Sequence, residues 1–299
     1  MWLERSSRIA GFSRVASLAL AIALVAPVDG AEGRNFLWKA TGRQNAIYLV
    51  GSVHMLTRDY YPLSPALDRA FNDSNLLVEE TNLAEMLAPA FQLTLLTRIM
   101  LPPSQSLEKV LSPGTYALVS RRVATLGVPI EPLQRFKPWY VALTLLGLEW
   151  QKAGFDPDLG LDKHFHDRAA SEGKPVQGLE TPAYQISRFD ELTQAQQDHL
   201  LAESIEELDR EQSHVATLAN AWRAGDAATV ERIVLEGVKD DPLMYQRLLV
   251  ERNRNWLPQI ESLFARQGRA FVVVGAAHLV GPDGLLTMLR AKGYSVEQQ

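Results

Sequence analysis

RAFVVVGAAHLV, at residues 269–280, carries the clearest strand signal in the chain. An uninterrupted apolar run that ends in glycine is typical of a strand buried on both faces of a parallel sheet. The segment YLVGSVH, at residues 48–54, repeats the order of apolar strand, glycine, two further residues and histidine. Ligands of open parallel sheets bind outside the carboxyl ends of the strands. We therefore expect His54 and His278 to lie at the same edge of one sheet.

Two further apolar segments end in glutamate. Residues 76–80 read LLVEE and residues 174–180 read KPVQGLE, so Glu79, Glu80 and Glu180 stand at strand ends. If these strands are neighbours, two imidazoles and two carboxylates meet, which suits Zn, Mn, Co or Fe(II). Three of the groups could hold a divalent ion while the fourth acts as general base on its bound water. The alternative is that the histidines cap strand ends and the glutamates pair with arginines.

The remaining segments alternate between strand and helix patterns. Further strands are expected at residues 35–40, 46–51 and 294–298, and helices at residues 65–72, 138–152, 193–221, 226–266 and 281–293. This alternation predicts an α/β fold, with a central, mostly parallel sheet flanked by helices and a helical insertion before the last strands. No linker rich in Pro, Gly or Ser sets the insertion apart, so residues 31–299 are predicted to form a single domain. Residues 138–152 are apolar nearly all round, which predicts a deeply buried helix.

A candidate cation lies in the segment LLVERNRNWL, residues 248–257. Arg252 and Asn253 stand there beside Trp256. An arginine near the strand ends could bind a substrate carboxylate or stabilise an oxyanion. The alternative is a solvated Glu–Arg face of a helix.

The other histidines carry less signal. His164 and His166 are two residues apart on an expected helix, so they point to different sides, and a surface or capping role is predicted for both. His199 and His214 lie in charged helical segments and are expected to be solvated.

Composition and missing motifs exclude several classes of function. The formal net charge is −5, which disfavours nucleic acid as a partner. Cysteine is absent, so disulfides, Cys-ligated zinc, iron–sulfur clusters and thiol nucleophiles are excluded. The chain has no G-x-S-x-G, G-x-x-x-x-G-K-[ST], G-x-G-x-x-G or H-E-x-x-H motif, which removes support for a serine hydrolase, a nucleotide-binding protein and a zincin.

Residues 1–30 have the pattern of a secretory signal peptide. Arg5, Arg8 and Arg14 precede the uncharged run VASLALAIALVAPV, residues 15–28, and cleavage is expected before Ala31. The apolar run is shorter than a membrane span requires. We expect an exported, periplasmic protein with no integral membrane segment after cleavage; the alternative is an uncleaved N-terminal anchor.

Several segments together resemble the TraB/GumN family, which is related to the Tiki proteins. The resemblance covers roughly residues 36–297 and rests on the segments IYLVGSVHMLTRDYYPLSPALDRAF (47–71), LLVEETNL (76–83), KPW (137–139), GKPVQGLETPAYQ (173–185), RNRNW (252–256) and VVVGAAHLVGPDGLLTMLRAKGYSV (272–296). It implies the fold shared with erythromycin-esterase-like and ChaN-like proteins. It also implies a site of two Gly-x-x-His motifs, two glutamates and an arginine, which match His54, His278, Glu80, Glu180 and Arg252.

The choice between adjacent glutamates follows from the same match. The TNL that follows residue 80 favours Glu80, and strand alternation lets only one of the pair face the site, with Glu79 as second choice. Between the two candidate bases, Glu80 is favoured over Glu180, since the carboxylate of Glu79 would raise the pKa of its neighbour.

The resemblance implies two kinds of activity. Tiki proteins are metal-dependent peptidases, so the first hypothesis is a metal-dependent hydrolase of peptide or other amide bonds, acting on a peptide or small-molecule substrate. ChaN-like relatives bind haem and iron, so the second hypothesis is a non-catalytic metal- or haem-binding protein in the periplasm. Tyr48, Tyr60 or Tyr61 could then supply a haem ligand. A third reading, an assembly partner in polysaccharide export, leaves the His–Glu cluster without a role.

Overall fold

The computed structural model describes residues 35–210, 214–239 and 241–299. The predicted signal peptide, residues 1–30, lies outside the described residues. The described residues belong to one compact unit.

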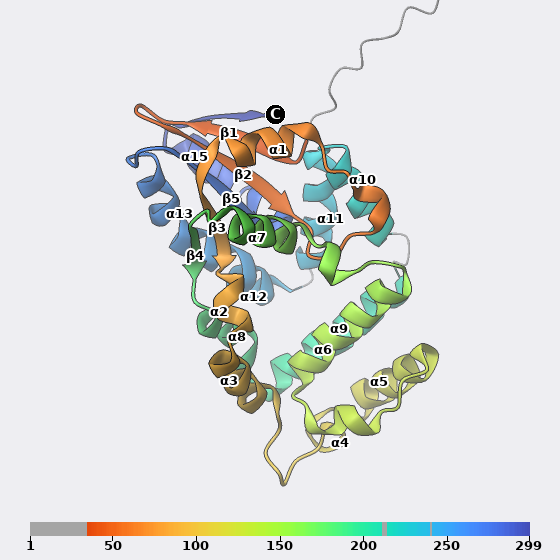
Figure 1. The fold of residues 1–299 in the computed structure, drawn as a ribbon. Coiled ribbons are helices and arrows are strands. Elements are labelled where there is room, and N and C mark those ends of the chain that lie inside the picture. The colour runs from red at the N-terminus through yellow and green to blue at the C-terminus, as the bar shows by residue number, and fades with distance from the viewer. Residues whose placement is uncertain (1–34, 211–213, 240) are drawn as a thin grey trace, which may run out of the picture. The chain divides into compact units, whose positions relative to one another are not determined.

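A six-stranded sheet forms the centre of the fold (Figure 1). Its strands are β1 (Leu37–Thr41), β2 (Ala46–Ser52), β3 (Ser74–Thr81), β4 (Val176–Glu180), β5 (Arg269–Gly275) and β6 (Ser295–Gln298). Their order is β4-β3-β5-β2-β1-β6. The four strands β4, β3, β5 and β2 run parallel, whereas β1 is antiparallel to both β2 and β6. The predicted α/β fold with a mostly parallel sheet is confirmed.

Helices join the strands in two long segments. Between β3 and β4 stand α2 (Leu83–Leu87), α3 (Pro89–Ile99), α4 (Leu107–Val110), α5 (Pro113–Leu126), α6 (Pro138–Lys152) and α7 (Leu161–Glu172). Between β4 and β5 stand α8 (Pro182–Asp190), α9 (Gln194–Arg210), α10 (His214–Arg223), α11 (Ala227–Lys239), α12 (Pro242–Tyr245), a π-helical turn (Gln246–Val250) and α13 (Glu251–Leu263). The second segment is the predicted helical insertion, and the first is a helical excursion of similar kind. Helix α1 (Pro65–Asn72) precedes β3, and α14 (Ala276–Leu279) and α15 (Leu285–Ala291) follow β5.

Local sequence explains where several helices begin and end. Ser112 accepts a hydrogen bond from the amide of Thr115 and caps α5, with Pro113 at its first position. Gly127 ends α5 and Gly173 ends α7, each with a left-handed backbone (φ +70° and +66°) that side chains with a Cβ rarely adopt.

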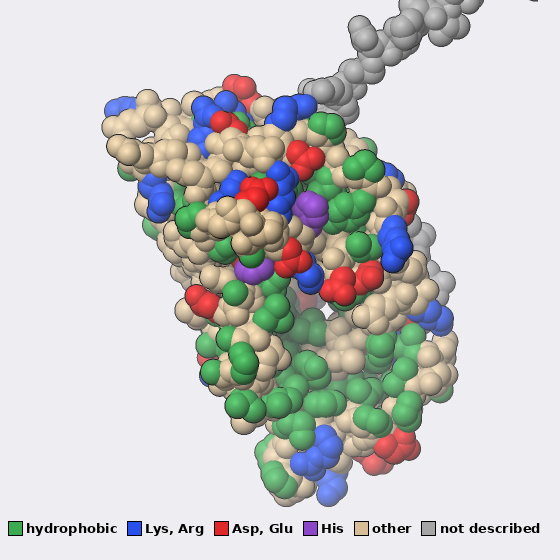
Figure 2. Space-filling view, viewed as in Figure 1, with side chains coloured by type: hydrophobic (Ala, Val, Ile, Leu, Met, Phe, Trp, Pro, Cys, Tyr) green, Lys and Arg blue, Asp and Glu red, His purple; other side chains and the backbone are tan. Residues whose placement is uncertain are grey.

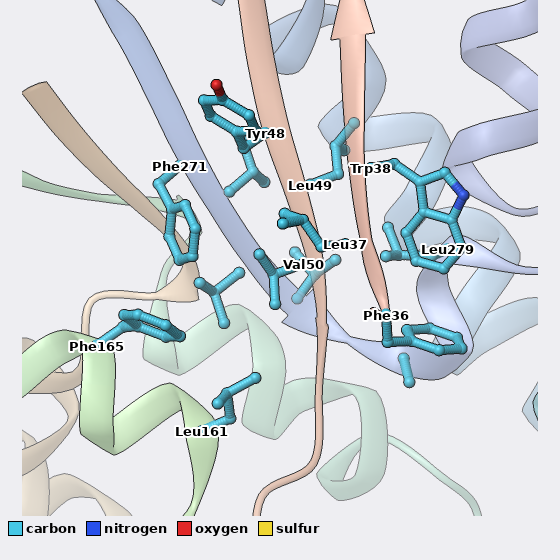
Figure 3. Close-up of a cluster of buried hydrophobic side chains, with 14 of the residues drawn as sticks. Phe36, Leu37, Trp38, Tyr48, Leu49, Val50, Leu161, Phe165, Phe271 and Leu279 are labelled. Carbon is cyan, nitrogen blue, oxygen red and sulfur yellow. The ribbon is translucent and has the colours of Figure 1, made fainter. Parts of the chain in front are cut away.

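Alternation along the strands directs neighbouring residues to opposite faces of the sheet. Phe271 of β5 points towards α7 and contacts Phe165, with ring centroids 4.6 Å apart (Figure 3). Phe71 at the end of α1 packs on both rings. These aromatic side chains join α1 and α7 to one face of the sheet, while α13 contacts β4.

A second buried cluster lies among helices only. Leu107, Val119, Leu145, Leu201 and Ile205 belong to it and come from α4, α5, α6 and α9. Figure 1 shows these helices grouped together, apart from the strands.

Helix α6 corrects one expectation. One face of the helix is buried, with Trp139 and Leu145 each 1% exposed. Leu143 and Leu146, however, are 40% and 38% exposed, because this face of the helix borders a cavity instead of the core. The prediction of burial all round was therefore wrong for the face of α6 that carries Leu143 and Leu146. Among the described residues, no helix is long and apolar enough to cross a membrane.

Candidate functional site

The strand order brings the two Gly-x-x-His segments together. Strands β2 and β5 are parallel neighbours, and Ser52 pairs with Gly275 at their carboxyl ends. His54 follows the first strand, and His278 lies in α14 directly after the second. A Cβ placed on Gly275 would lie 3.2 Å from Glu80 Oε1 and 3.9 Å from His54 Nε2. The glycine therefore lets three functional side chains approach the strand end closely.

The two glutamates join this edge from the neighbouring strands. Glu80 ends β3, beside β5, and its Oε1 accepts a 2.7 Å hydrogen bond from the Gly275 amide. Its Oε1 also lies 3.7 Å from His278 Nε2. Gln185 Nε2 donates to Glu80 Oε2 at 3.0 Å. Glu180 ends β4 on the far side of β3.

Arg252 links both glutamates to the histidine. Its Nη2 donates to Glu80 Oε2 at 2.6 Å and to Glu180 Oε1 at 2.8 Å. Its Nη1 lies 3.0 Å from His278 Nε2. The side chain is 8% exposed, so the alternative of a solvated Glu–Arg face is wrong for this arginine. Arg252 follows the π-helical turn at residues 246–250, a distortion often found at functional sites.

Glu180 is held from two sides. Arg252 Nε donates to both of its oxygens, at 3.0 and 3.2 Å, and Trp256 Nε1 donates to Oε2 at 2.9 Å. Its side chain is buried and does not line the neighbouring cavity.

Each histidine has its Nδ1 fixed by a hydrogen-bond partner. His278 Nδ1 lies 2.7 Å from Asn253 Oδ1, and the Asn253 amide donates to the carbonyls of His278 and Asp283. Those two acceptors orient the Asn253 amide, so its Oδ1 accepts from His278 Nδ1–H and leaves a lone pair on Nε2. His54 Nδ1 lies 2.7 Å from Asp162 Oδ2.

The surroundings shift the pKa values in different directions. Burial lowers the pKa of His278 to about 3, which keeps its imidazole neutral. Asp162 raises the pKa of His54 to about 9. Burial raises the pKa of Glu180. Burial would also raise the pKa of Glu80, but Arg252 and the two histidines outweigh it and hold that pKa well below its usual range.

The other member of the glutamate pair lies on the opposite face of the sheet. Glu79 accepts from the Leu83 amide at 3.1 Å, and its Oε1 lies 3.0 Å from His166 Nδ1 on α7. The expectation that Glu79 raises the pKa of Glu80 was therefore wrong, because alternation separates the two carboxylates and Arg252 contacts Glu80 instead.

The remaining histidines differ from one another. His166 is 9% exposed and pairs with Glu79, so its predicted surface or capping role was wrong. His164 is half-buried against the Tyr61 ring, and His199 is exposed as predicted. The side chain of His214 lies outside the described residues.

Polar and apolar walls enclose a cavity of about 380 Å³ beside the histidines. The polar wall holds His54, His278, Glu80 and Arg252. The other wall consists of apolar side chains from α6, α10 and α11. Figure 2 shows hydrophobic side chains gathered around a hollow at the level of α6.

The three tyrosines considered as haem ligands are bonded elsewhere. Tyr48 donates to Asp73 at 2.6 Å, Tyr60 to Asn220 at 3.4 Å and Tyr61 to the Leu159 carbonyl at 2.8 Å. No tyrosine among the described residues lines the cavity.

The structure thus brings together all five residues that the sequence singled out. Sequence reasoning missed Asp162 and Gln185, which bond to His54 and Glu80 from α7 and α8. Neither lies in a strand-end motif. Gln185 ends the segment GKPVQGLETPAYQ that carries the resemblance, whereas no signal in the sequence marked Asp162. Asn253 was marked only by its place beside Arg252.

The types of ligand atom at the site suit a divalent ion, but in this structure these atoms do not surround a common point. Two imidazole Nε2 atoms and the Glu80 carboxylate are ligands of borderline softness, and partners on both Nδ1 atoms are typical of metal-binding histidines. Among the described residues, no three His, Asp or Glu side chains form a ready coordination group. Arg252 Nη1 stands at His278 Nε2, the atom that a metal would require.

Comparisons with known proteins give a consistent result. A sequence model of the TraB/PrgY/gumN family matches residues 36–298. Two relatives carry the name "Uncharacterized protein YbaP", one from Shigella flexneri and one from Escherichia coli strain K12. Each is 25% identical over 265 residues, which cover 86% of this chain and 94% of the relative. No solved structure matches the chain.

Proposed function

The chain belongs to the TraB/PrgY/gumN family, as the sequence resemblance predicted, and on that basis we propose that it is an exported, metal-dependent hydrolase of peptide or other amide bonds. One observation carries the proposal. Two histidines from adjacent strand ends, each fixed at Nδ1, stand beside the buried carboxylate of Glu80 at the wall of a cavity.

His54, His278 and Glu80 would hold the ion in this proposal. With Glu80 and Glu180 ionised and Arg252 protonated, the site carries one net negative charge when both imidazoles are neutral, which favours a dication. When bound, the ion would lower the pKa of a water molecule and polarise the scissile carbonyl. Binding requires Arg252 Nη1 to release His278 Nε2 and His54 to lose the proton that Asp162 stabilises.

The remaining polar groups would act through charge and position. Arg252 lines the cavity and would stabilise negative charge on the carbonyl oxygen as it develops. Glu180 would hold the guanidinium in place through its paired hydrogen bonds and is a positioning residue. Glu80 is proposed as a ligand and not as the base, because a carboxylate with a pKa well below its usual range is a weak proton acceptor.

Metal analysis of the purified protein, followed by a peptide-library cleavage assay with Mn²⁺, Co²⁺ and Zn²⁺, tests the proposal. We expect stoichiometric metal and metal-dependent cleavage by the parent protein. His54→Ala and His278→Ala should each lose both, whereas Glu180→Gln should retain metal with reduced turnover.

His199→Ala is the matched control, since this histidine is exposed and does not line the cavity. It should leave metal content and cleavage unchanged. Full metal content and activity in both His54→Ala and His278→Ala would place the site elsewhere. Metal binding by the parent protein without cleavage of any peptide would replace the hydrolase with a metal-binding protein.

A further inference from the structure

The cavity beside the histidines has two walls of different chemistry. Its charged and titratable side chains are His54, Glu80, Arg252 and His278, and Arg252 contacts both Glu80 and His278. The opposite wall carries no charged side chain among the described residues. It is formed by Leu143, Leu146, Trp150, Leu218, Trp222 and Val234, together with smaller side chains.

The apolar wall is incompletely covered. Leu143 and Leu146 are among the few large hydrophobic side chains of the described chain that are more than a third exposed. Leu146 lies one helical turn and Leu143 two turns before Trp150, so the three side chains share one face of α6. An apolar group that fills the space in front of them would remove this surface from water, and binding strength would grow with the area covered.

The wall has a fixed shape. Helix α6 is held from behind by the buried cluster that includes Val141, Ala142 and Leu145. Helix α10 is tied to the sheet, because Trp222 Nε1 donates to the Gly51 carbonyl at 2.6 Å. The cavity is therefore built on rigid elements, which is typical of preformed ligand sites.

From these observations we propose that the apolar wall selects the substrate: a molecule with a large, uncharged apolar group next to the amide bond that faces the histidines. This inference rests on the proposed function for the identity of the reacting bond. A charged group at the same place would be desolvated without a partner, so charged residues at that position are disfavoured. The apolar group would enter between α6, α10 and α11 while its amide lies against the polar wall.

Gly147 offers a direct way to change the cavity. It lines the cavity, and a Cβ placed on it meets no atom within 4 Å. Gly147→Leu would thus fill the cavity without a clash at the backbone, and leucine favours the helix more than glycine does. Gln151→Leu is the matched control, because it adds the same side chain to an exposed position of α6 that does not line the cavity.

Binding is measured first, without turnover, by the tryptophan fluorescence of the metal-free protein. The probes are the neutral straight-chain primary amides from acetamide to octanamide. We expect affinity to rise about threefold to fourfold with each added methylene until the cavity is filled. Gly147→Leu should bind the longest amides at least about tenfold more weakly, and Gln151→Leu should bind them as the parent does.

The second measurement is the cleavage preference of the metal-loaded protein in a peptide library. Large apolar residues should be favoured on one side of the cleaved bond, and Gly147→Leu should shift the preference to smaller residues with its metal content unchanged. The inference is overturned if the affinity of the parent protein for the amides does not depend on their chain length. It is also overturned if Gly147→Leu shows the same dependence on chain length as the parent.

Failure of the proposed function has a different signature. The parent protein would bind longer amides more tightly, Gly147→Leu would lose this dependence, and the parent would cleave no peptide with any metal. That result would support the selectivity of the apolar wall and would reject the hydrolase. His54→Ala also separates catalysis from apolar selectivity. This variant should lose peptide cleavage, while its affinity for the amides should still rise with their chain length.

Discussion

Arg252 is the residue on which the site depends most. It is the cation paired with both Glu80 and Glu180, whose side chains are 10% and 4% exposed. Its removal would leave two carboxylates buried without their charged partner. Breaking a buried ion pair by removing one partner typically costs about 3–5 kcal/mol.

Arg252→Ala should therefore lower the free energy of unfolding by about 3–5 kcal/mol, measured by urea denaturation of the metal-free protein. Arg254→Ala, two residues along the same helix, is the control. Arg254 is 64% exposed and lies 3.7 Å from Asp283, so its loss should change stability by no more than about 0.5 kcal/mol. Equal effects of the two substitutions would show that the buried network contributes little.

At the scale of elements, Asp73 at the end of α1 forms polar contacts with both β2 and β5. Tyr48 on β2 donates to Asp73, which also forms an ion pair with Arg269 at the start of β5. Burial and the hydrogen bond to Asp73 raise the pKa of Tyr48 to about 12. A hydroxyl with a raised pKa favours its neutral form in the folded state, so its contribution to stability is complete below pH 10 and is lost as the pH rises towards 12.

Tyr48→Phe should accordingly make the stability of the protein less dependent on pH between about 10 and 12. The comparison is of urea midpoints for the parent and the variant over that range. Near neutral pH the variant should be less stable than the parent, and the difference should narrow as the pH rises. A constant difference across the range would mean that Tyr48 titrates as it does in the unfolded chain.

At the scale of the whole molecule, the described residues form two buried clusters, one around the sheet and one among α4, α5, α6 and α9. Leu145 lies in the helical cluster and is 1% exposed. Its truncation would leave a cavity among those helices without touching the strands. Large-to-small changes of this kind cost about 2–5 kcal/mol.

Leu145→Ala should therefore weaken the helical cluster more than the sheet. In native-state hydrogen exchange, amides of α5, α6 and α9 should lose protection, while those of β3 and β5 keep it. The variant should also weaken selection by the apolar wall, because α6 carries that wall. Equal loss of protection in β5 would show that the two clusters unfold as one cooperative unit.

The sequence by itself determined the strands, the edge at which the histidines meet and the family. Those conclusions depend on local patterns: the apolar runs at 48–54 and 269–280, the glycines that end them, and side-chain alternation, which lets only one of Glu79 and Glu80 face the site. The TNL that follows residue 80 favoured Glu80. Such patterns are readable because backbone geometry converts spacing along the chain directly into direction in space.

Only the tertiary structure decided what those residues contact. Arg252 is buried between two carboxylates because α13 contacts β4 and places the guanidinium between Glu80 and Glu180. Asp162 and Gln185 reach the site from α7 and α8. The face of α6 that carries Leu143 and Leu146 is apolar yet exposed, because a cavity lies in front of it. An apolar pattern specifies that a face avoids water, but whether protein, ligand or open space lies against it depends on elements that are distant in the sequence.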